Sequence, residues 1–467
     1  MEPSVTASKP ARLVEMETLP VGRLLWRFAV PAITGMVVNA LYNVVDRIFV
    51  GRGVGTLAIA ATTVGFPVMI LMMALPVLVG VGATALVSIR LGERRHEEAA
   101  RVAGNAMVLL VATSLTASAL ALIWLRPLLV ALGATEAVLP YAVRYLRIIL
   151  PGSVFMTLGF GLSHLIRAEG QPLLAMTINL VGAVSNVVLD YLFIFPLGMG
   201  IEGAAIATVI AQALSAAWAL HYYLSGRSVL KLQAAHLAVD VPTCRAIVAL
   251  GVPQFMLQLV GSVQQTILNR SLALYGGDLA IAAMGVVFSL VAFLFMPVVG
   301  IAQAAGPIIS YNHGAGQRRR VHRALGLASL WATIVVTAGY VVTRLWPEAL
   351  VALFGKGDEA LVAMGTQTIA IAFLALPVVG FQVIGSSYFQ ATGKPRQATV
   401  LTLSRQLLLL MPLLLVLPRL WGLAGIWWSL PLADLGSAAL TAIWLYRDLV
   451  KGARAETNPA GQGAPGV

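Results

Sequence analysis

Long apolar runs separated by short polar segments form the main pattern of this chain. About twelve runs begin near Leu24, Leu57, Val102, Tyr141, Leu173, Gly203, Ala246, Leu279, Ala324, Val362, Val400 and Leu423. The separators are charged or rich in Gly and Pro, as in 90–101, 168–172 and 312–320. A helix needs roughly 20 apolar residues to cross a bilayer. The pattern therefore predicts an all-α polytopic membrane protein with twelve transmembrane helices.

Composition supports the membrane class and excludes others. The 467 residues are 59% hydrophobic and 11% charged, with one cysteine, Cys244. Mean hydropathy is +0.88. An ordinary soluble domain is about 45–50% apolar and about 25% charged, so this chain has too few charges to cover a soluble globule. A single cysteine also rules out a disulfide scaffold.

The excess of positive charge predicts orientation. The net charge is +12. With the N-terminus inside, 21 basic residues fall in the segments expected on the cytoplasmic side and eight in those expected outside. Because cytoplasmic loops carry the excess of Lys and Arg, we expect both termini inside a bacterial plasma (inner) membrane and no nucleic-acid partner. The first 23 residues lack the apolar stretch of a signal peptide, so the first helix should be retained.

An internal repeat divides the chain in two. A shift of 222 residues, with a drift of one or two, aligns Val30-Pro31 with Val252-Pro253, the Leu-Ala-Ile-Ala-Ala segments at 57–61 and 279–283, 92–95 with 316–319, 168–172 with 391–395, and Gly203 with Gly425. Each half then has six spans, which makes the halves parallel repeats. The predicted organisation is a cytoplasmic segment 1–23, an N-lobe 24–225, a cytoplasmic linker 226–245, a C-lobe 246–447 and a cytoplasmic, disordered tail 448–467.

Two six-helix lobes are the arrangement of a transporter rather than of a channel or an enzyme. The sequence contains no phosphate-binding loop of the G-x-x-x-x-G-K-[ST] type, no His/Cys spacing typical of a metal site, and no G-x-S-x-G motif. We therefore expect no enzyme activity and no cofactor. Energy has to come from an ion gradient or from the gradient of the substrate. We expect the protein to act as a monomer.

Polar residues form a stripe on the first predicted span. Asn39, Tyr42, Asn43 and Asp46 recur at helical spacing and share one face. An ionisable group in a span costs about 2.5–3.5 kcal/mol on insertion scales, so it needs a specific reason. The stripe is expected to face a cavity. The alternative is that Asp46 only pairs with Arg47 near the interface.

A second stripe lies on the fifth predicted span. Asn179, Asn186 and Asp190 share a face there, and Thr208 lies within two turns of the start of the next span. The topology places Asp190 and Thr208 at the depth of Asp46, in the outer third of the membrane. Two carboxylates, an amide and a hydroxyl at one level suit either a Na⁺ ion, which prefers oxygen ligands, or a shared proton. The alternative for Thr208 is a bond to its own helix backbone.

The acidic pair occurs in the first half only. Under the repeat, position 46 corresponds to Leu268 and position 190 to Pro412 or Leu413. The site for a coupling ion is therefore predicted in the N-lobe.

The second half has polar residues of its own. Gln254, Gln258 and Gln265 form a stripe on the seventh span, and Arg405 and Asp434 lie inside the eleventh and twelfth spans. The glutamines either line a substrate cavity or bond between helices. An Arg405–Asp434 ion pair would neutralise both charges, either as a structural clamp or as part of transport.

Pro31 lies inside the first span. Because proline removes a backbone hydrogen bond, the first helix is expected to kink there. The kink is either an inert feature or a hinge.

Taken together, these segments resemble the multidrug and toxic compound extrusion (MATE) family over Leu24–Arg447. The resemblance rests on 30–31, 39–51, 185–190, 200–208, 404–406 and 431–434. It implies a V-shaped twelve-helix antiporter that exports amphipathic, mostly cationic organic compounds in exchange for H⁺ or Na⁺ by alternating access. It also implies that Asp46 is essential for coupling, that Asn186, Asp190 and Thr208 join it in the cation site with Tyr42 beside them, and that Pro31 bends the first helix.

One difference from a branch of this family indicates which other branches the chain resembles. The norfloxacin-efflux branch carries acidic residues on its seventh, eighth and tenth helices. This chain has glutamines in those regions, at 254, 258, 265, 303 and 382. The resemblance is therefore closer to branches with an N-lobe cation site.

Two other carriers share the architecture and remain as alternatives. A lipid-linked precursor flippase of the same superfamily would need several cationic residues around its cavity, whereas Arg47 and Arg405 are the clearly intramembrane bases here. A major-facilitator carrier would carry G-x-x-x-D-R-x-G-R-[RK] after its second helix, and residues 92–101 do not match that motif.

Overall fold

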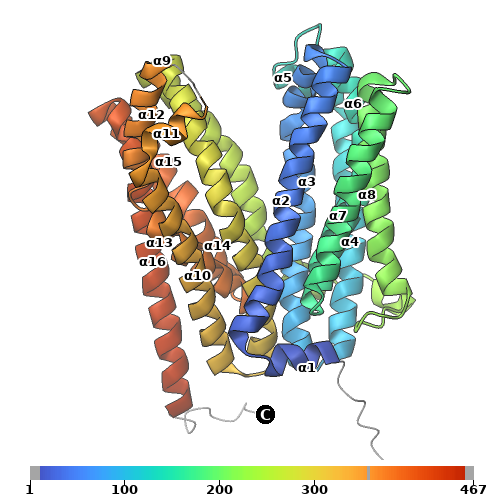
Figure 1. Ribbon diagram of the computed structural model, residues 1–467. Helices are drawn as coiled ribbons and strands as arrows, with labels where there is room; N and C mark the ends of the chain where they lie inside the picture. The colour runs from blue at the N-terminus through green and yellow to red at the C-terminus, as the bar shows by residue number, and fades with distance from the viewer. Residues whose placement is uncertain (1–10, 355–357, 458–467) are drawn as a thin grey trace, which may run out of the picture. The chain divides into compact units, whose positions relative to one another are not determined.

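A computed structural model describes residues 11–354 and 358–457, and the regular structure of these residues is helical throughout (Figure 1). The first half contains α1 (Ala11–Thr18), α2 (Val21–Gly53), α3 (Thr56–Gly92), α4 (His96–Ile123), α5 (Leu125–Ala131), α6 (Leu139–Ala168), α7 (Pro172–Ile194) and α8 (Gly200–Leu224). The short 3₁₀ turn η1 (Ala234–Leu237) follows. The second half contains α9 (Val241–Gly314), α10 (Arg318–Leu345), α11 (Pro347–Ala352), α12 (Glu359–Ala372), α13 (Leu376–Ala391), α14 (Pro395–Leu403), the π-helix η2 (Ser404–Leu410), α15 (Met411–Trp421) and α16 (Leu423–Thr457).

The membrane-spanning helices agree with the predicted number. Ten helical stretches of the described residues are long and apolar enough to cross a bilayer, and the pair α12 and α13, bent by 51°, supplies an eleventh. The 74-residue α9 is two helices, because Gly277 interrupts it with φ 63° and ψ −161°. Counting both parts of α9 gives twelve spans, so the predicted twelve-helix, all-α membrane fold is confirmed.

The internal repeat is visible in the backbone. Glycine tolerates positive φ because it has no Cβ, and positive φ recurs at equivalent places in the two halves. The matched residues are Gly55 and Gly277, Arg94 and Gly316, Gly170 and Gly393, and Gly200 and Gly422. The short helices α5 and α11 also begin 222 residues apart. The two halves therefore share turns as well as helices.

The described residues form two compact units. The first consists of residues up to Val263 together with Met296–Ala328 and Tyr388–Thr399, and the second of Gln264–Phe295, Ser329–Ser387 and the chain from Val400 onward. The first unit thus contains the whole first half and the ends of several helices of the second half. Helix α16 continues to Thr457, and the rest of the predicted tail, residues 458–467, lies outside the described residues.

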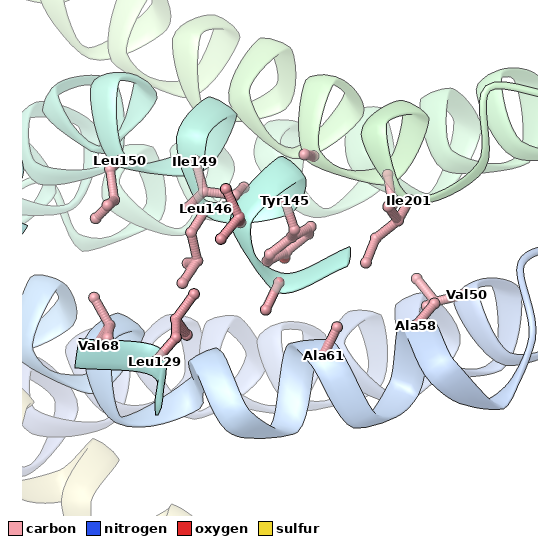
Figure 2. Close-up of a cluster of buried hydrophobic side chains, with 14 of the residues drawn as sticks. Val50, Ala58, Ala61, Val68, Leu129, Tyr145, Leu146, Ile149, Leu150 and Ile201 are labelled. Atoms are coloured by element: carbon pink, nitrogen blue, oxygen red, sulfur yellow. The ribbon is translucent and has the colours of Figure 1, made fainter. Parts of the chain in front are cut away.

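The apolar core of the first unit holds α3, α6 and α8 together. Figure 2 shows Tyr145, Leu146 and Ile149 on α6 facing the small and branched side chains of α3, among them Ala61 and Val68. These side chains are at most 5% exposed. Because protein interiors are close-packed, the displacement of one helix is transmitted to its neighbours rather than absorbed. Because α2 packs on α7, and α7 on α8, this core fixes the frame on which the polar residues of α2 and α7 stand.

Two glycine contacts bring helices of the two halves together inside the first unit. A Cβ on Gly92, the last residue of α3, would lie 2.1 Å from the carbonyl oxygen of Tyr311, and a Cβ on Gly314, the last residue of α9, would lie 2.1 Å from that of Ile89. These two contacts are equivalent under the repeat. Small residues let membrane helices approach at their backbones, so this crossing depends on glycine.

A buried carboxylate fixes the connection between α6 and α7. Glu169 is fully buried and its Oε2 accepts hydrogen bonds from the Tyr222 hydroxyl (3.0 Å), the Ser228 hydroxyl (2.7 Å) and the Val229 amide (2.7 Å). The Arg12 guanidinium donates to the Tyr222 hydroxyl at 3.1 Å. One carboxylate thus joins the α6–α7 turn to the end of α8 and to α1.

Asn105 of α4 holds the segment that leads into α9. Its side-chain amide donates to the carbonyls of His236 (3.4 Å) and Ala238 (3.2 Å), and its oxygen accepts from the Asp240 amide (2.8 Å) and the Cys244 thiol (3.3 Å). The predicted linker is therefore docked on α4 by the buried Asn105 side chain and by Glu97, whose Oε1 lies 2.7 Å from His236 Nε2.

Candidate functional site

Two carboxyls face each other across the α2–α7 contact. Asp190 of α7 is fully buried and Asp46 of α2 is half-buried. The Asp46 carboxyl acts directly on Asp190, through its charge and as a hydrogen-bonding neighbour. Neither oxygen of Asp190 accepts a hydrogen bond from an N–H or hydroxyl donor of the described residues. Two neighbouring acidic groups, one of them fully buried, can share a proton or a cation.

Asn186 and Thr208 continue this polar surface one turn away. The Asn186 side-chain amide donates to the Thr208 hydroxyl at 3.2 Å, and that hydroxyl donates to the carbonyl of Ala204 at 2.9 Å. The Asn186 Oδ1 atom is buried and has no partner among the described residues. Thr208 therefore makes the hydrogen bond to its own helix backbone that was predicted as the alternative to an ion-binding role. Its hydroxyl also orients the Asn186 side chain.

Two tyrosines border the carboxyls. Tyr42 of α2 lies near enough to Asp46 and Asp190 for both charges to act on it. Tyr145 of α6, only 4% exposed, lies within the range of Asp46, Tyr42 and Asp190 as well. Tyrosine hydroxyls both donate and accept hydrogen bonds. They are suited to orienting an ion or a proton between the carboxyls.

Tyr145 is the residue that sequence reasoning missed. It lies on the fourth span near Tyr141, Arg144 and Arg147, close to the expected end of that span, where aromatic and basic residues are common and do not indicate a site. Figure 2 shows it among the apolar core residues of α6 and α3, and it is the tertiary packing that also brings its hydroxyl within range of Asp46 and Asp190.

The site is rich in acceptors and poor in donors. Oxygen atoms of Asp46, Asp190, Asn186 and Thr208 are the type of ligand that hard cations take, and a carboxyl pair equally accommodates one proton. No group of three or more His, Cys, Asp and Glu side chains suited to a metal ion occurs in the part of the chain that the structure describes. These oxygen atoms therefore suit Na⁺ or H⁺ as the bound ion. The side chain of Arg47, the alternative partner of Asp46, lies outside the described residues.

The other polar residues of α2 and α7 lie toward one end of the same contact. The Asn43 side-chain amide donates to the Asn39 carbonyl at 2.7 Å, and the Asn179 amide lies 3.6 Å from where a Cβ on Gly35 would be. Asn39 and Asn179 are half-buried and Asn43 is exposed. These side chains continue the polar surface of α2 and α7 beyond the carboxyls.

The predicted glutamine stripe divides between the two units. Gln254 and Gln258 belong to the first unit, and Gln265 to the second, where its side-chain amide donates to the Asn269 oxygen at 2.9 Å. Gln258 is exposed, whereas Gln254 and Gln265 are half-buried. The structure thus does not place all three glutamines in one compact unit.

Pro31 is buried inside α2, within the first turns of the span. Its repeat partner Pro253 is buried inside α9. Two residues after Pro31, α2 packs closely against α9: a Cβ on Gly300 of α9 would lie 2.4 Å from the Ile33 side chain.

In the second unit the structure places Arg405 and Asp434 in contact. The Arg405 Nε donates to Asp434 Oδ1, and the guanidinium lies over the Phe295 ring at 5.6 Å from its centroid. Arg405 belongs to the π-helix η2 and Asp434 to α16.

A duplicated six-helix bundle with two contacting carboxyls on one half is the architecture of a secondary transporter. Comparison with known proteins agrees. The sequence profile of the MatE family matches residues 31–192 and 253–416, one match in each half. The chain belongs to the MatE family.

Curated relatives align over nearly the full length. The multidrug export protein MepA of Staphylococcus aureus is 28% identical over 444 residues, which covers 94% of this chain and 97% of the relative. MepA of Staphylococcus saprophyticus is 25% identical over 450 residues, covering 96% and 99%.

Solved structures share the fold. A structure of the MATE multidrug transporter DinF-BH in complex with rhodamine 6G is 39% identical, has a TM-score of 0.84, and covers 92% of this chain and 96% of that one. An outward-facing MATE transporter of the MOP superfamily has a TM-score of 0.87 at 23% identity, with 94% and 98% covered. Together these establish a multi-pass membrane protein with the MATE fold.

Proposed function

We propose that this chain is a multidrug efflux antiporter that exports amphipathic, mostly cationic organic compounds in exchange for H⁺ or Na⁺ by alternating access. The observation that carries the proposal is the contact between Asp46 and Asp190, a pair of carboxyls with no N–H or hydroxyl donor to Asp190 among the described residues. The names of the relatives, which are multidrug export proteins, support the same class.

Exchange follows from competition for the same negative charge. With one coupling ion bound, one of the two negative charges is neutralised and the repulsion between the Asp46 and Asp190 carboxyls is relieved. An entering organic cation favours the charged pair and so promotes release of the ion. Because each ligand needs the same carboxyls, binding of one weakens binding of the other. No cofactor or catalytic group is needed for this cycle.

The proposal includes orientation. Both termini and the 226–245 segment lie on the cytoplasmic side of the plasma membrane in this proposal, which the excess of basic residues in these segments supports. The Asp46 and Asp190 ends of α2 and α7 then lie toward the outside, where the coupling ion enters.

The test is efflux of rhodamine 6G from proteoliposomes under a proton gradient and, separately, a sodium gradient. Asp46→Asn and Asp190→Asn should each abolish gradient-driven export while the purified protein keeps its elution profile. The matched control is Asp278→Asn, which changes an exposed carboxylate in the same way. Driven export by wild-type protein under one gradient identifies the ion. Export driven by neither gradient, or undiminished export by Asp46→Asn, would refute the proposal.

A further inference from the structure

A second charged cluster lies inside the second unit, far along the chain from the carboxyl pair. With a rise of 1.5 Å per helical residue, Arg405 lies about 15 Å from the start of the span at Pro395. Asp434 lies about 17 Å from the start of α16 at Leu423. Both distances are about half of a hydrocarbon core of roughly 30 Å. The cluster is therefore near the middle of the membrane, where a charge needs a specific reason.

The local backbone is built around this arginine. Residues Ser404–Leu410 form a π-helix, a rare element that often occurs at functional sites. The Ser404 hydroxyl is 2.8 Å from the Ser437 hydroxyl and donates to the Leu401 carbonyl at 2.8 Å. These bonds tie the start of η2 to α16, so the direction of Arg405 is fixed from both helices.

Only one nitrogen of the Arg405 guanidinium makes a hydrogen bond to the described residues. Its Nε donates to Asp434, and one face is covered by the Phe295 ring. Its terminal nitrogens Nη1 and Nη2 have no hydrogen-bond partner in the part of the chain that the structure describes. The Arg405 side chain is 25% exposed, whereas that of Asp434 is 6% exposed. Arg405 is therefore the more accessible member of the pair.

We propose that the guanidinium edge formed by Nη1 and Nη2 is a subsite for the carboxylate of transported zwitterionic compounds. The guanidinium edge matches a carboxylate with two parallel hydrogen bonds, and the Phe295 ring beside it offers an apolar surface to an aromatic ligand. Asp434 already offsets much of the charge of Arg405. A carboxylate is then held by geometry more than by net charge, which allows it to leave again, as a transported group must.

The equivalent helix pair in the first half contains no Lys or Arg. Helices α7 and α8 hold Asp190, Asn186 and Thr208, whereas η2 and α16 hold Arg405 together with Asp434. A purely structural clamp is the competing explanation. A clamp would favour both carboxylate oxygens on both guanidinium nitrogens, whereas here a single Nε–Oδ1 bond is made.

The inference rests on the proposed export function, and the experiment separates the two. Rhodamine 6G is an ester; its hydrolysed free acid carries a carboxylate on the same ring system. Competitive uptake into inverted vesicles or efflux from proteoliposomes is measured for both dyes. If neither dye is transported, the proposed function fails. If the ester is transported and the free acid is not, only the carboxylate subsite fails.

The diagnostic variant is Arg405→Lys, which keeps the positive charge beside Asp434 but loses the two-nitrogen edge. Its expected effect is an increase of about tenfold in the half-saturating concentration of the free acid, the size of one lost charge-assisted hydrogen bond, with transport of the ester unchanged. Arg419→Lys, the same change at an exposed arginine on α15, is the control and should alter neither dye.

A second variant guards against a folding defect. Asp434→Asn removes the competing carboxylate and should lower the half-saturating concentration of the free acid relative to that of the ester. Equal loss of both dyes in Arg405→Lys, with an unchanged ratio in Asp434→Asn, would overturn the inference in favour of a structural clamp.

Discussion

The glycine crossing in the first unit gives the sharpest quantitative prediction. Gly314→Ala places a methyl group 2.1 Å from the Ile89 carbonyl oxygen, 2.9 Å from its carbonyl carbon and 3.0 Å from its Cα. Real Cβ atoms essentially never approach a neighbour closer than 3.0 Å, so the helices have to separate by the remaining 0.9 Å. The obstacle is backbone, which has no rotamer to adopt, and the ends of α3 and α9 must therefore move.

Overpacking of this kind costs about 1–3 kcal/mol, partly offset by the up to about 1 kcal/mol that alanine gains over glycine in a helix. The expected result is a fall of about 2–4 °C in the melting temperature of the purified protein in detergent, followed by intrinsic tryptophan fluorescence. Gly92→Ala makes the equivalent contact with Tyr311 and should behave alike.

The double variant tests the geometry further. Once one methyl group has separated the helices, the second finds much of the space already made. The combined loss is therefore expected to be smaller than the sum of the two single losses. Gly306→Ala on the same helix is the control, since a Cβ there meets no described atom within 4 Å. An equal fall in the control, or no fall in Gly92→Ala and Gly314→Ala, would show that the close approach is not what holds this crossing.

Three further predictions concern the connections and the edge of the site. Asn105→Ala removes the four Asn105 bonds to the 236–244 segment and leaves the His236–Glu97 bond, so maleimide labelling of Cys244 should become faster; Thr113→Ala on the same helix, whose hydroxyl bonds its own helix (2.6 Å), should leave the rate unchanged, and equal rates in all three proteins would contradict the docking. Burial raises the pKa of the Glu169 carboxyl above its ordinary 4.5, against the lowering effect of its hydrogen bonds. The folded protein then binds that proton more tightly than the unfolded chain does, so stability decreases as pH rises from about 4.5 through the raised pKa; Glu169→Gln should reduce this part of the pH dependence in thermal melts, and an unaltered slope would argue against it. Tyr145→Phe removes the hydroxyl beside the carboxyls and should shift the pH or sodium dependence of dye efflux without loss of folded protein, whereas an unchanged profile would place Tyr145 in the apolar core alone.

Much of the fold was readable because a bilayer restricts the choices. A span has to satisfy its own backbone hydrogen bonds, so each long apolar run had to be a helix. The predicted starts agree with the helices: the run near Leu24 begins at Val21, and the run near Leu423 begins at that residue. The break in α9 was also expected, since Gly277 lies between two predicted spans.

The site was readable in part for a related reason. Polar groups in a span are costly, so Asp46 and Asp190 stood out, and helical spacing related them to Tyr42 and Asn186. Tyr145 could not be found in this way, because an aromatic residue is normal in a core. The unused donors of Arg405 were equally hidden, since a sequence shows two opposite charges and not which atoms meet.

Sequence alone establishes a duplicated, twelve-helix membrane bundle whose acidic pair, Asp46 and Asp190, has no counterpart in the second half. Those properties follow from local rules of hydropathy, spacing and charge, which act on each segment separately. Tertiary structure alone decided which atoms meet: that no hydroxyl or N–H of the described residues reaches Asp190, that Glu169 accepts three bonds, and that Gly92 and Gly314 touch carbonyls. Contacts between residues far apart in the chain depend on how whole helices pack, and packing at a few tenths of an ångström is not encoded in any one segment.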